Sequence, residues 1–502
     1  MKGERSLRAR LLTSIILLGM ICTTASARTI YVDDDGPADF NTIQDAINDS
    51  NDGDTIIVAD GTYTGLGNRD IDFLGKAITV CSENGPESCI IDCDSSETEY
   101  HRGFYFHSGE DANSVLDGFT ITNGYADTNG GGGIDCFKSS PMISNCIIRG
   151  NVAPLIRLQG LWGVVLSFNN GGGIHISWSS PIITNCFIMD NRVTGNGGGI
   201  GLYSSSPIIS NCVIAGNIAL HKGFGLGGAI HSNRSSPTII NCTVIENVAE
   251  ERGGGIYCLR TGNPTITNSI FWANLPHEIY VSTGAPSTLV VAYSNVQDGW
   301  AGEVNIDVDP CFAFVGFWDP NENPEDPNDD FWVEGDYHLL TDSPSIDAGD
   351  PNYIDEPNET DLDGKPRVIG GRIDMGAYEY MHPVPAQIRI VPRTINPASK
   401  GKWIAAFLQL PEDYNVADID PDTVLLQGEI EPQRFWFAKR HQIAIAIFSR
   451  KDIQTILEVG EIKLTITGWL VDGTAFEGTD VIRVLNKGGG KAALRVKIKD
   501  EE

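Results

Sequence analysis

Apolar and polar residues alternate with a period of two in five copies of one phrase in the middle of the chain. In the regular copies the phrase reads P-x-I-x-N-C-x-I-x-x-N, with Val replacing the second Ile once. A period of two predicts β-strands, and the copies are rich in Ile, Val and Thr, which favour strands. The copies occupy residues 139–151, 179–191, 205–217, 235–247 and 262–274.

A Gly-Gly-Gly-Ile or Gly-Gly-Ala-Ile tetrad precedes each copy of the phrase. The step from the tetrad Ile to the first Asn of the phrase is 11 residues in four copies and 12 in the fifth. The step between successive tetrads varies between 26 and 40 residues. A fixed part beside a part that absorbs insertions predicts a solenoid, with coils of about 26 residues and three short strands each.

Stacked coils place equivalent residues in ladders, because parallel strands of neighbouring coils pair at a spacing of about 4.8 Å. One ladder should point inward and form the core: Ile143, Ile183, Ile209, Ile239 and Ile266. A second should lie at a bend, where Asn tolerates left-handed backbone angles: Asn145, Asn185, Asn211, Asn241 and Asn268. A third consists of thiols and ends at Ser269: Cys146, Cys186, Cys212 and Cys242.

On these repeats the chain resembles the right-handed parallel β-helix family, the pectin-lyase-like superfold, with repeats similar to those of polymorphic outer-membrane proteins. The resemblance covers about residues 28–295. It implies an all-β fold, with a right-handed parallel β-helix over residues 28–300. It does not imply one activity, because this fold hosts lyases, hydrolases, esterases and non-catalytic adhesins.

The N-terminal part of this region predicts a cap over the first coil. Residues 40–48 place Ile43, Ala46 and Ile47 on one helical face, with Asn41 or Thr42 as the N-cap. A strand is expected at residues 55–58. The F-x-T-I-Q-x-A-I pattern resembles the N-terminal cap of many β-helix proteins.

Three further regions follow the solenoid. Residues 301–382 comprise an acidic, Pro-rich loop and a segment that resembles the choice-of-anchor module, on the motifs SPSIDAG and DMGAYE. Residues 386–486 alternate in strand-length runs and predict a small β-sandwich that binds or acts as a spacer. Residues 487–502 are rich in Gly, Lys and Glu and predict a frayed tail.

The N-terminus has the pattern of a cleavable secretory signal. Four basic residues precede an apolar run at residues 11–22, and Ala25-Ser26-Ala27 follows as a cleavage site, with Ala27 the last residue removed. This predicts a secreted or cell-surface protein. No later stretch is long and apolar enough to predict a membrane span in the mature chain.

The net charge of −31 makes the chain a poor candidate for binding nucleic acid. The charge is uneven, however. Between residues 130 and 274 there are eight Lys or Arg residues against five Asp or Glu residues. The coils could therefore hold a polyanion, although the whole chain is acidic.

The strand after each tetrad supplies the candidate binding residues. Odd offsets from the tetrad Ile should point outward, and the adjoining turn adds further side chains. Aromatic, imidazole and cationic groups on one face suit stacking on sugars and pairing with carboxylates, although an ordinary mixed solvent face would look the same. The candidates are Lys138, His175, Trp178, Tyr203, His231, Arg234, Tyr257 and Arg260.

Insertions at residues 152–170 and 218–226 should form loops beside this face. The first contains Leu161 and Trp162 and could be a lid, a groove wall, an oligomer contact or a segment packed on the coils.

No metal or other cofactor is predicted. Calcium stays open for Asp33–Asp35 and for the Asp-rich turns after residue 336, where a solvated turn is the alternative. The periodic cysteines predict buried ladder residues, with Cys81, Cys89 and Cys93 the better disulfide candidates.

The leading functional hypothesis is a secreted or surface protein that binds extracellular polysaccharide on its coils. The first alternative is a polysaccharide lyase acting on an acidic glycan, with Lys138, His231, Arg234 and Arg260 as its suspects. The second is a non-catalytic adhesin or spacer. Asp135 and Asp190 lie on different predicted strands, so they make a poor carboxylate pair for hydrolysis.

Overall fold

The computed structural model describes residues 26–485, except residues 127–129, 155, 161–162, 168, 285–286, 322–329, 356, 358, 397–400, 455, 458 and 472–473. The predicted leader lies outside the described residues except for its last two positions, and the predicted tail lies outside them altogether. The chain divides into two compact units. One comprises residues up to 308 with 316–335, and the other comprises residues 309–315 with those from 336 onward.

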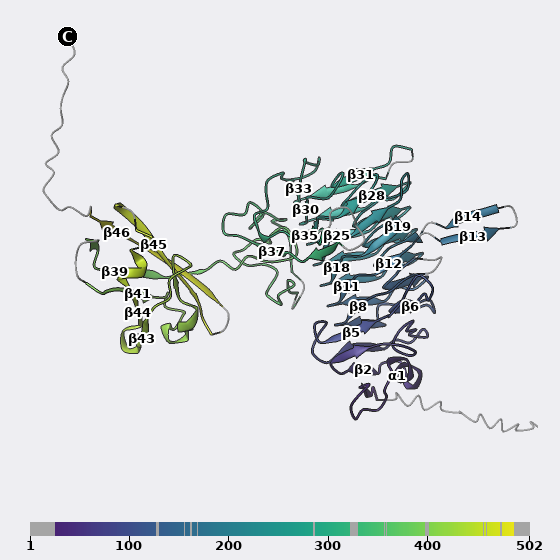
Figure 1. Ribbon diagram of the computed structural model, residues 1–502, viewed down its shortest axis with the longest axis horizontal. Coiled ribbons are helices and arrows are strands. Elements are labelled where there is room, and N and C mark those ends of the chain that lie inside the picture. The colour runs from purple at the N-terminus through teal and green to yellow at the C-terminus, as the bar shows by residue number, and fades with distance from the viewer. Residues whose placement is uncertain are drawn as a thin grey trace, which may run out of the picture. The chain divides into compact units, whose positions relative to one another are not determined.

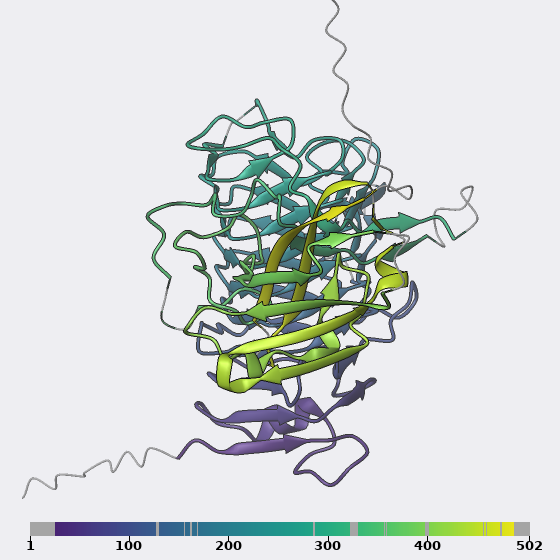
Figure 2. The same cartoon turned by 90° about the vertical axis from the view of Figure 1, so that its left-hand side faces the viewer.

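The first unit is a parallel β-solenoid whose coils stack in chain order, from the purple N-terminal coil to the teal last coil (Figure 1 and Figure 2). A ten-stranded parallel sheet contains β1 Thr29–Val32, β2 Thr55–Val58, β4 Thr79–Ser82, β7 Val115–Asp117, β10 Met142–Ser144, β17 Ile182–Thr184, β21 Ile208–Ser210, β25 Thr238–Ile240, β29 Thr265–Thr267 and β32 Val290–Ala292. A nine-stranded sheet contains β3 Gly61–Tyr63, β5 Cys89–Asp92, β8 Thr120–Thr122, β11 Ile147–Arg149, β18 Phe187–Met189, β22 Val213–Ala215, β26 Thr243–Ile245, β30 Ile270–Trp272 and β33 Asn295–Val296.

Two further sheets complete the coils. A seven-stranded sheet contains β6 Phe104–Phe106, β9 Ile134–Phe137, β16 Ile174–Ser177, β20 Ile200–Tyr203, β24 Ile230–Asn233, β28 Ile256–Leu259 and β31 Ile279–Val281. A short sheet contains β12 Val152–Ala153, β19 Arg192–Asn196, β23 Ile218–Leu220 and β27 Val248–Ala249, with β15 Asn169–Asn170 beside β19. The three main strands of each coil agree with the prediction, and the short sheet is an addition to it.

The cap helix α1, Ile43–Asp49, lies at the N-terminal end of the solenoid as predicted. Thr42 is the N-cap, and its hydroxyl accepts a hydrogen bond from the backbone N–H of Asp45. Ile43, Ala46 and Ile47 are buried. The helix therefore buries its apolar face against the first coil.

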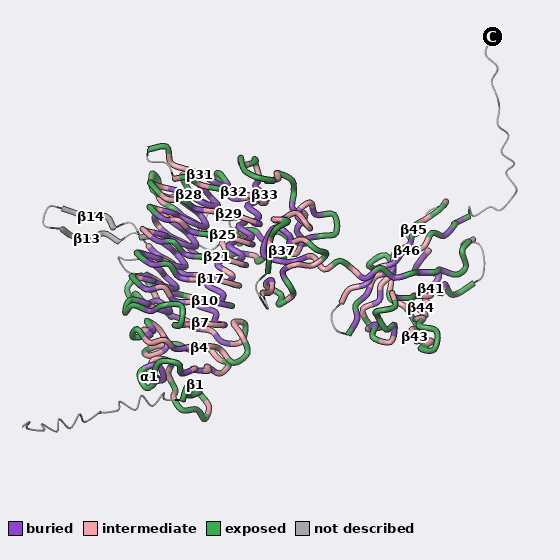
Figure 3. The backbone as a smooth tube through the Cα atoms, turned by 180° about the vertical axis from the view of Figure 1, so that it is seen from behind, coloured by how far each residue is buried: buried purple, intermediate pink, exposed green. Residues whose placement is uncertain are grey.

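The predicted ladders are present. The five Ile residues of the inward ladder are fully buried and pair in register from strand to strand, and buried residues recur along the coils in Figure 3. The bend asparagines adopt φ values between 49° and 53° at Asn145, Asn185, Asn211 and Asn268, and 54° at Asn241. Each bend residue therefore uses the left-handed conformation that Asn tolerates.

A second asparagine ladder, which was not predicted, runs along the last residue of each phrase. From the second Asn onward, each side-chain oxygen accepts hydrogen bonds from the backbone N–H and the side-chain amide of the Asn one coil earlier. The carboxylate of Glu278 accepts the last two bonds, from Asn274. The ladder is buried and consists of Asn151, Asn191, Asn217, Asn247 and Asn274.

The thiol ladder is buried as predicted. Cys186, Cys212 and Cys242 each donate to the backbone carbonyl two residues earlier in the chain. All ten cysteines of the described residues are free thiols, including Cys81, Cys89 and Cys93. The ladder cysteines therefore act as small core residues.

Two segments expected to be loops contain strands. Within residues 152–170, β13 Ile156–Gly160 and β14 Gly163–Ser167 form an antiparallel hairpin, which projects from the stack of coils in Figure 1. Within the acidic region, β35 Phe317–Asp319 and β36 Phe331–Val333 form a second hairpin. The Arg192 guanidinium lies 4.5 Å from the Trp318 ring centroid, so this hairpin packs on the coils.

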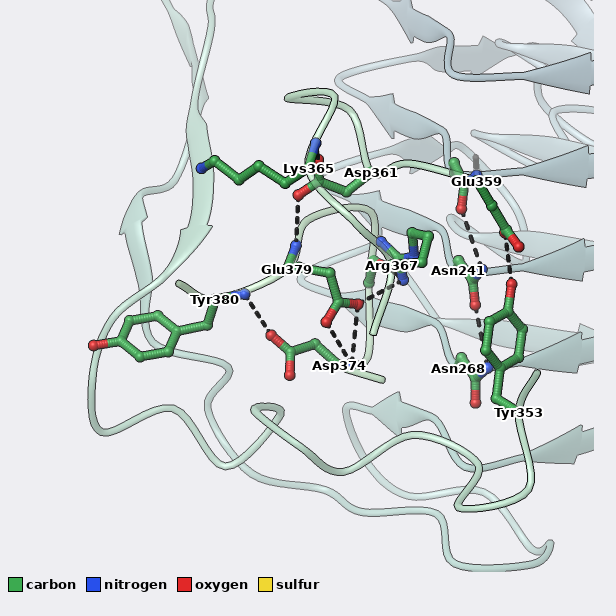
Figure 4. Close-up of polar contacts among 12 residues, drawn as sticks. Asn241, Asn268, Tyr353, Glu359, Asp361, Lys365, Arg367, Asp374, Glu379 and Tyr380 are labelled. Atoms are coloured by element: carbon green, nitrogen blue, oxygen red, sulfur yellow. Dashed lines mark hydrogen bonds and ion pairs between the residues drawn. The ribbon is translucent and has the colours of Figure 1, made fainter. Parts of the chain in front are cut away.

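The second unit begins with β34 Phe312–Phe314, paired with β37 Asp336–Leu339. The residues that follow, up to β38, contain no strand among those described, and side chains hold their loops together (Figure 4). Arg367 and Glu379 form a fully buried ion pair at 3.1 Å. Burial raises the pKa of Glu379 and that of Asp374, and the Arg367 guanidinium opposes the rise at both carboxyl groups.

A β-sandwich follows, as predicted. Its antiparallel four-stranded sheet contains β39 Gln387–Val391, β41 Trp403–Gln409, β44 Ile443–Ser449 and β43 Arg434–Ala438. The other sheet contains β38 Val384–Pro385, β40 Thr394–Ile395, β42 Leu425–Leu426, β45 Gly460–Trp469 and β46 Ala475–Val484. Both sheets contribute to one core, including Ile404, Leu408, Phe448, Ile466 and Phe476. Short helices join the strands: α2 Arg450–Ile453, η1 Val416–Asp418, η2 Pro421–Thr423 and η3 Lys439–His441.

No helix among the described residues is long and apolar enough to cross a membrane.

Candidate functional site

The candidate residues lie along the seven-stranded sheet and in the turn after each of its strands. In that turn one residue per coil has a positive φ, which turns the chain away from the sheet. The φ values are 52° for Lys138, 51° for Trp178, 54° for Arg234 and 66° for Arg260. All four side chains are exposed.

Four of the candidates and Phe137 form a continuous group, which we call the aromatic strip: Phe137, Lys138, Trp178, Tyr203 and Arg234. The ring of Trp178 lies edge-on to Phe137 at 5.7 Å and to Tyr203 at 5.1 Å, measured between centroids. The Lys138 ammonium lies 5.0 Å from the Phe137 ring centroid. The Arg234 guanidinium donates to the Tyr203 hydroxyl at 3.4 Å. Trp178 is 54% exposed.

The strip therefore has an aromatic centre with a cation at each end. Arg260, one coil beyond Arg234, extends the cationic end. Four of the predicted residues lie together in the strip: Lys138, Trp178, Tyr203 and Arg234. Phe137 also stands at an odd offset from its tetrad Ile, but it was not among the candidates.

The remaining candidates lie in a second column, closer to the Gly-rich tetrads. Strand register aligns Asp135, His175, Gly201, His231 and Tyr257 in this column. These residues point away from the core, as expected, but His231 and Tyr257 are buried. The prediction of an exposed position is therefore wrong for His231 and Tyr257.

The physical reason is close packing within this column, which is tightest at Gly201. A Cβ added at Gly201 would lie 2.5 Å from the backbone nitrogen of Gly171 and 2.7 Å from the carbonyl carbon of Asn170. His231 is only 3% exposed and Tyr257 only 6% exposed, so neither side chain offers a ligand a surface to contact.

His231 is an uncharged packing residue. Neither of its ring nitrogens has a hydrogen-bond partner, and burial lowers its pKa to about 3. Its ring stacks on Tyr257 at 5.8 Å, and Tyr257 stacks on Tyr280 at 5.4 Å. His231 is therefore excluded as the base suspected from sequence.

His175 has a different environment. Its Nδ1 lies 2.9 Å from a carboxylate oxygen of Asp135, and the other oxygen of Asp135 lies 2.7 Å from the Arg102 guanidinium. Asp135 is only 2% exposed, whereas His175 keeps part of its ring accessible. Because Asp135 engages Nδ1, Nε2 of His175 is the nitrogen left to accept a proton or a hydrogen bond.

Sequence reasoning missed this arrangement of Arg102, Asp135 and His175. Arg102 lies 33 residues before Asp135, in a coil without the recognisable phrase. The pairing of Asp135 with His175 could have been predicted, because both hold the same offset from their tetrad Ile in adjacent coils.

Asp135 and Asp190, the two acids considered for hydrolysis, do not face each other as a carboxylate pair. Asp135 is engaged by Arg102 and His175, and Asp190 lies in the turn after β18, on the nine-stranded sheet. Burial raises the pKa of Asp190.

Among the described residues, Asp33, Asp34 and Asp35 are the acidic group compact enough to share a metal ion, with ligand atoms within 4.8 Å of one another. Asp33 also accepts backbone hydrogen bonds from Asp35 and Gly36, as a capping turn does. In the Asp-rich turns of the second unit, Asp361 and Asp374 accept backbone N–H groups.

A protein-family model described as the right handed beta helix region matches residues 161–292. Among solved structures, the chain is similar to a pectate lyase, with a TM-score of 0.38 and 15% identity over 71% of this chain and 97% of the other. It is also similar to a pectin methylesterase from carrot, with a TM-score of 0.31 and 12% identity over 57% of this chain and 85% of the other. A search of curated proteins gave no match. The family match and the parallel coils together identify the first unit as a right-handed parallel β-helix.

Proposed function

We propose that the chain binds an extracellular polysaccharide along the aromatic strip. The observation that carries the proposal is the exposed Trp178 ring, held edge-on between Phe137 and Tyr203 with Lys138 and Arg234 at the two ends. Exposed aromatic rings that their neighbours hold in place offer an apolar face to sugar rings at little entropic cost.

The spacing of the coils supports an extended ligand. Lys138 and Arg260 are four coils apart, which corresponds to about 19 Å at the spacing of parallel strands. A chain of several sugars can therefore contact the rings at its centre and the cations toward its ends. The cations favour carboxylated or sulfated sugars. The proposed extracellular location rests on the leader pattern of residues 1–27.

The test is the affinity of the mature chain for polysaccharides, followed by substitution of Trp178. A glycan array identifies the ligand, and titration calorimetry compares wild type with Trp178→Ala. Tyr31→Ala is the matched control, because Tyr31 is 51% exposed on the ten-stranded sheet. We expect Trp178→Ala to weaken binding about tenfold or more and Tyr31→Ala to leave it unchanged. Equal affinities for all three proteins would refute the strip as the site.

A second candidate function, eliminative cleavage of an acidic polysaccharide, is favoured by the contacts of His175. Nε2 of His175 would take the proton from the carbon beside a sugar carboxyl group. The electron pair of that C–H bond would form the new double bond as the glycosidic C–O bond breaks, and the leaving oxygen would take a proton from water. Lys138, Arg234 and Arg260 are the cations available to the substrate carboxylates.

Absorbance near 235 nm, which reports the unsaturated product, tests this function on pectate, alginate and glycosaminoglycans, each with Ca²⁺ or with a chelator. If the chain is a lyase, His175→Ala and Asp135→Asn will abolish the signal, while His277→Ala, at an exposed histidine, will keep it. If wild type binds a polysaccharide but the absorbance near 235 nm does not rise, the lyase function is refuted and only the binding function remains. The adhesin or spacer alternative applies if no polysaccharide binds.

A further inference from the structure

The outer face of the four-stranded sheet in the sandwich is unusually apolar. In a sandwich, alternate residues of each strand face the core and solvent, so the outer positions are normally polar. Here most outer positions are apolar and half-buried or exposed: Val391, Trp403, Ala405, Phe407, Trp436, Ala438, Ile443, Ile445 and Ile447.

Strand register arranges these residues as a platform. One row crosses the sheet as Arg389, Phe407, Ile445 and Trp436. With strands about 4.8 Å apart, Phe407 and Trp436 lie about 10 Å from each other. Trp403 lies four residues from Phe407 on the same strand, about 14 Å away. Three aromatic rings are thus spread over one flat surface instead of gathered into one cluster.

Two hollows lie beside the rings. One has a volume of about 480 Å³, and its lining includes Phe407, Gln387, Arg389 and Gln409. The other, of about 340 Å³, is lined by Trp403 with Lys402, Gln433 and Lys451. Each hollow combines one aromatic side chain with amide and cationic donors.

The face also differs in charge from the rest of the chain. The outer positions of these four strands, all of them described, carry Arg389 and Arg434 and no Asp or Glu. The whole chain has 66 acidic and 35 basic residues. A partner complementary to this face is therefore anionic and presents apolar surfaces between its hydrogen-bonding groups.

We propose that this face, with Trp403, Phe407, Trp436, Arg389 and Arg434, is a second binding site for acidic polysaccharide. Sugar rings pair an apolar face with a rim of hydroxyl groups, which matches separated aromatic rings with amide donors at the margins of the face. The carboxylate or sulfate groups of the ligand meet the two arginines. The site is separate from the aromatic strip of the solenoid and does not depend on it.

The test uses the whole mature chain with Trp178→Ala, so that the strip contributes less to binding. In this background Trp436→Ala and Phe407→Ala are compared with Trp469→Ala for binding to immobilised pectate, alginate and heparin, with dextran as the neutral probe. Trp469 is the matched control, because it is 47% exposed on the other sheet while Trp436 is 45% exposed. Circular dichroism and the melting temperature check that each variant is folded.

We expect the Trp178→Ala chain to keep measurable affinity for the acidic polysaccharides. Trp436→Ala or Phe407→Ala should reduce that affinity tenfold or more, Trp469→Ala should not change it, and added salt should weaken it. Complete loss of binding in Trp178→Ala would refute the sandwich site and would support the strip as the binding site. Equal affinity in all the sandwich variants would overturn it as well.

Two other results would assign the face to another partner and overturn the proposal. One is concentration-dependent self-association that Trp436→Ala abolishes. The other is binding to anionic phospholipid vesicles, lost in the same variant, without binding to any polysaccharide. If wild type binds no polysaccharide at all, both this site and the strip are refuted.

Discussion

Asparagine has two distinct roles in each coil of the β-helix. At the bend, Asn145 and its equivalents adopt a left-handed backbone conformation. At the end of the phrase, Asn217 and its equivalents are buried and satisfy the N–H groups of the neighbouring coil. The first role concerns backbone angle and the second concerns buried hydrogen bonds, so substitution should affect them differently.

Asn217→Ala should destabilise the β-helix by about 2–4 kcal/mol, because it leaves the buried backbone N–H of Asn191 and one of its two amide hydrogens without an acceptor. Asn145→Ala, at an exposed bend, should cost only about 1–2 kcal/mol, the penalty of a left-handed residue. Urea denaturation measures both. A smaller loss for Asn217→Ala than for Asn145→Ala would contradict the assigned roles.

The periodic residues could be predicted from sequence, but what covers them could not. Alternation showed that His231 and Tyr257 face away from the core, which is correct. It could not show that both side chains are buried, because burial depends on how rings of neighbouring coils stack, as His231 does on Tyr257 and Tyr257 on Tyr280. The exposed residues of the strip were easier to predict, because Lys138, Trp178 and Arg234 lie in the turn after a strand, where the side chain points away from the sheet.

At the scale of elements, the stability of the last coils depends on the residue that ends the buried Asn ladder. Glu278 accepts both terminal hydrogen bonds from Asn274, and burial raises its pKa to about 8. A carboxyl group with a raised pKa in the folded state stabilises the fold fully below its unfolded pKa. That contribution is lost as the pH rises through 8.

Glu278→Gln should remove this pH dependence, because the amide oxygen still accepts a hydrogen bond and the side chain stays neutral. Hydrogen exchange at the Asn247 and Asn274 amides should be similar in both proteins at pH 5, after correction for the intrinsic exchange rate. At pH 9 the variant should be more stable by roughly 1–4 kcal/mol. A variant that is less stable than wild type at pH 9 would show that Glu278 is ionised without penalty.

The element boundaries were predicted best where spacing is fixed. The cap strand β2 and helix α1 follow their hydrophobic patterns closely. The hairpins β13–β14 and β35–β36 were missed, since they lie in insertions where no repeat constrains the pairing. The second hairpin is held by pairing between β35 and β36 and by packing of Trp318 on Trp332. The composition of a short segment does not predict contacts between residues this far apart.

At the scale of the whole molecule, the two units have different sources of stability. The β-helix relies on ladders, whereas the loops before the sandwich rely on the buried pair of Arg367 and Glu379. Arg367→Met should cost about 3–5 kcal/mol in the second unit, because it leaves a buried carboxyl group without its partner. The double variant with Glu379→Gln should recover part of that loss.

Differential scanning calorimetry tests this prediction, since each unit should contribute its own transition. We expect Arg367→Met to lower one transition and leave the other in place. Lowering of both transitions by the same amount would show that the two units unfold together.

Two cationic, aromatic surfaces on a chain of net charge −31 suggest one kind of partner for both units. The measurement that tests the central claim most directly is calorimetric titration of wild type and Trp178→Ala with the same acidic polysaccharide at two salt concentrations. We predict weaker binding by Trp178→Ala at both salt concentrations and weaker binding by wild type at the higher one. Identical affinity in the two proteins would contradict the aromatic strip as the binding site.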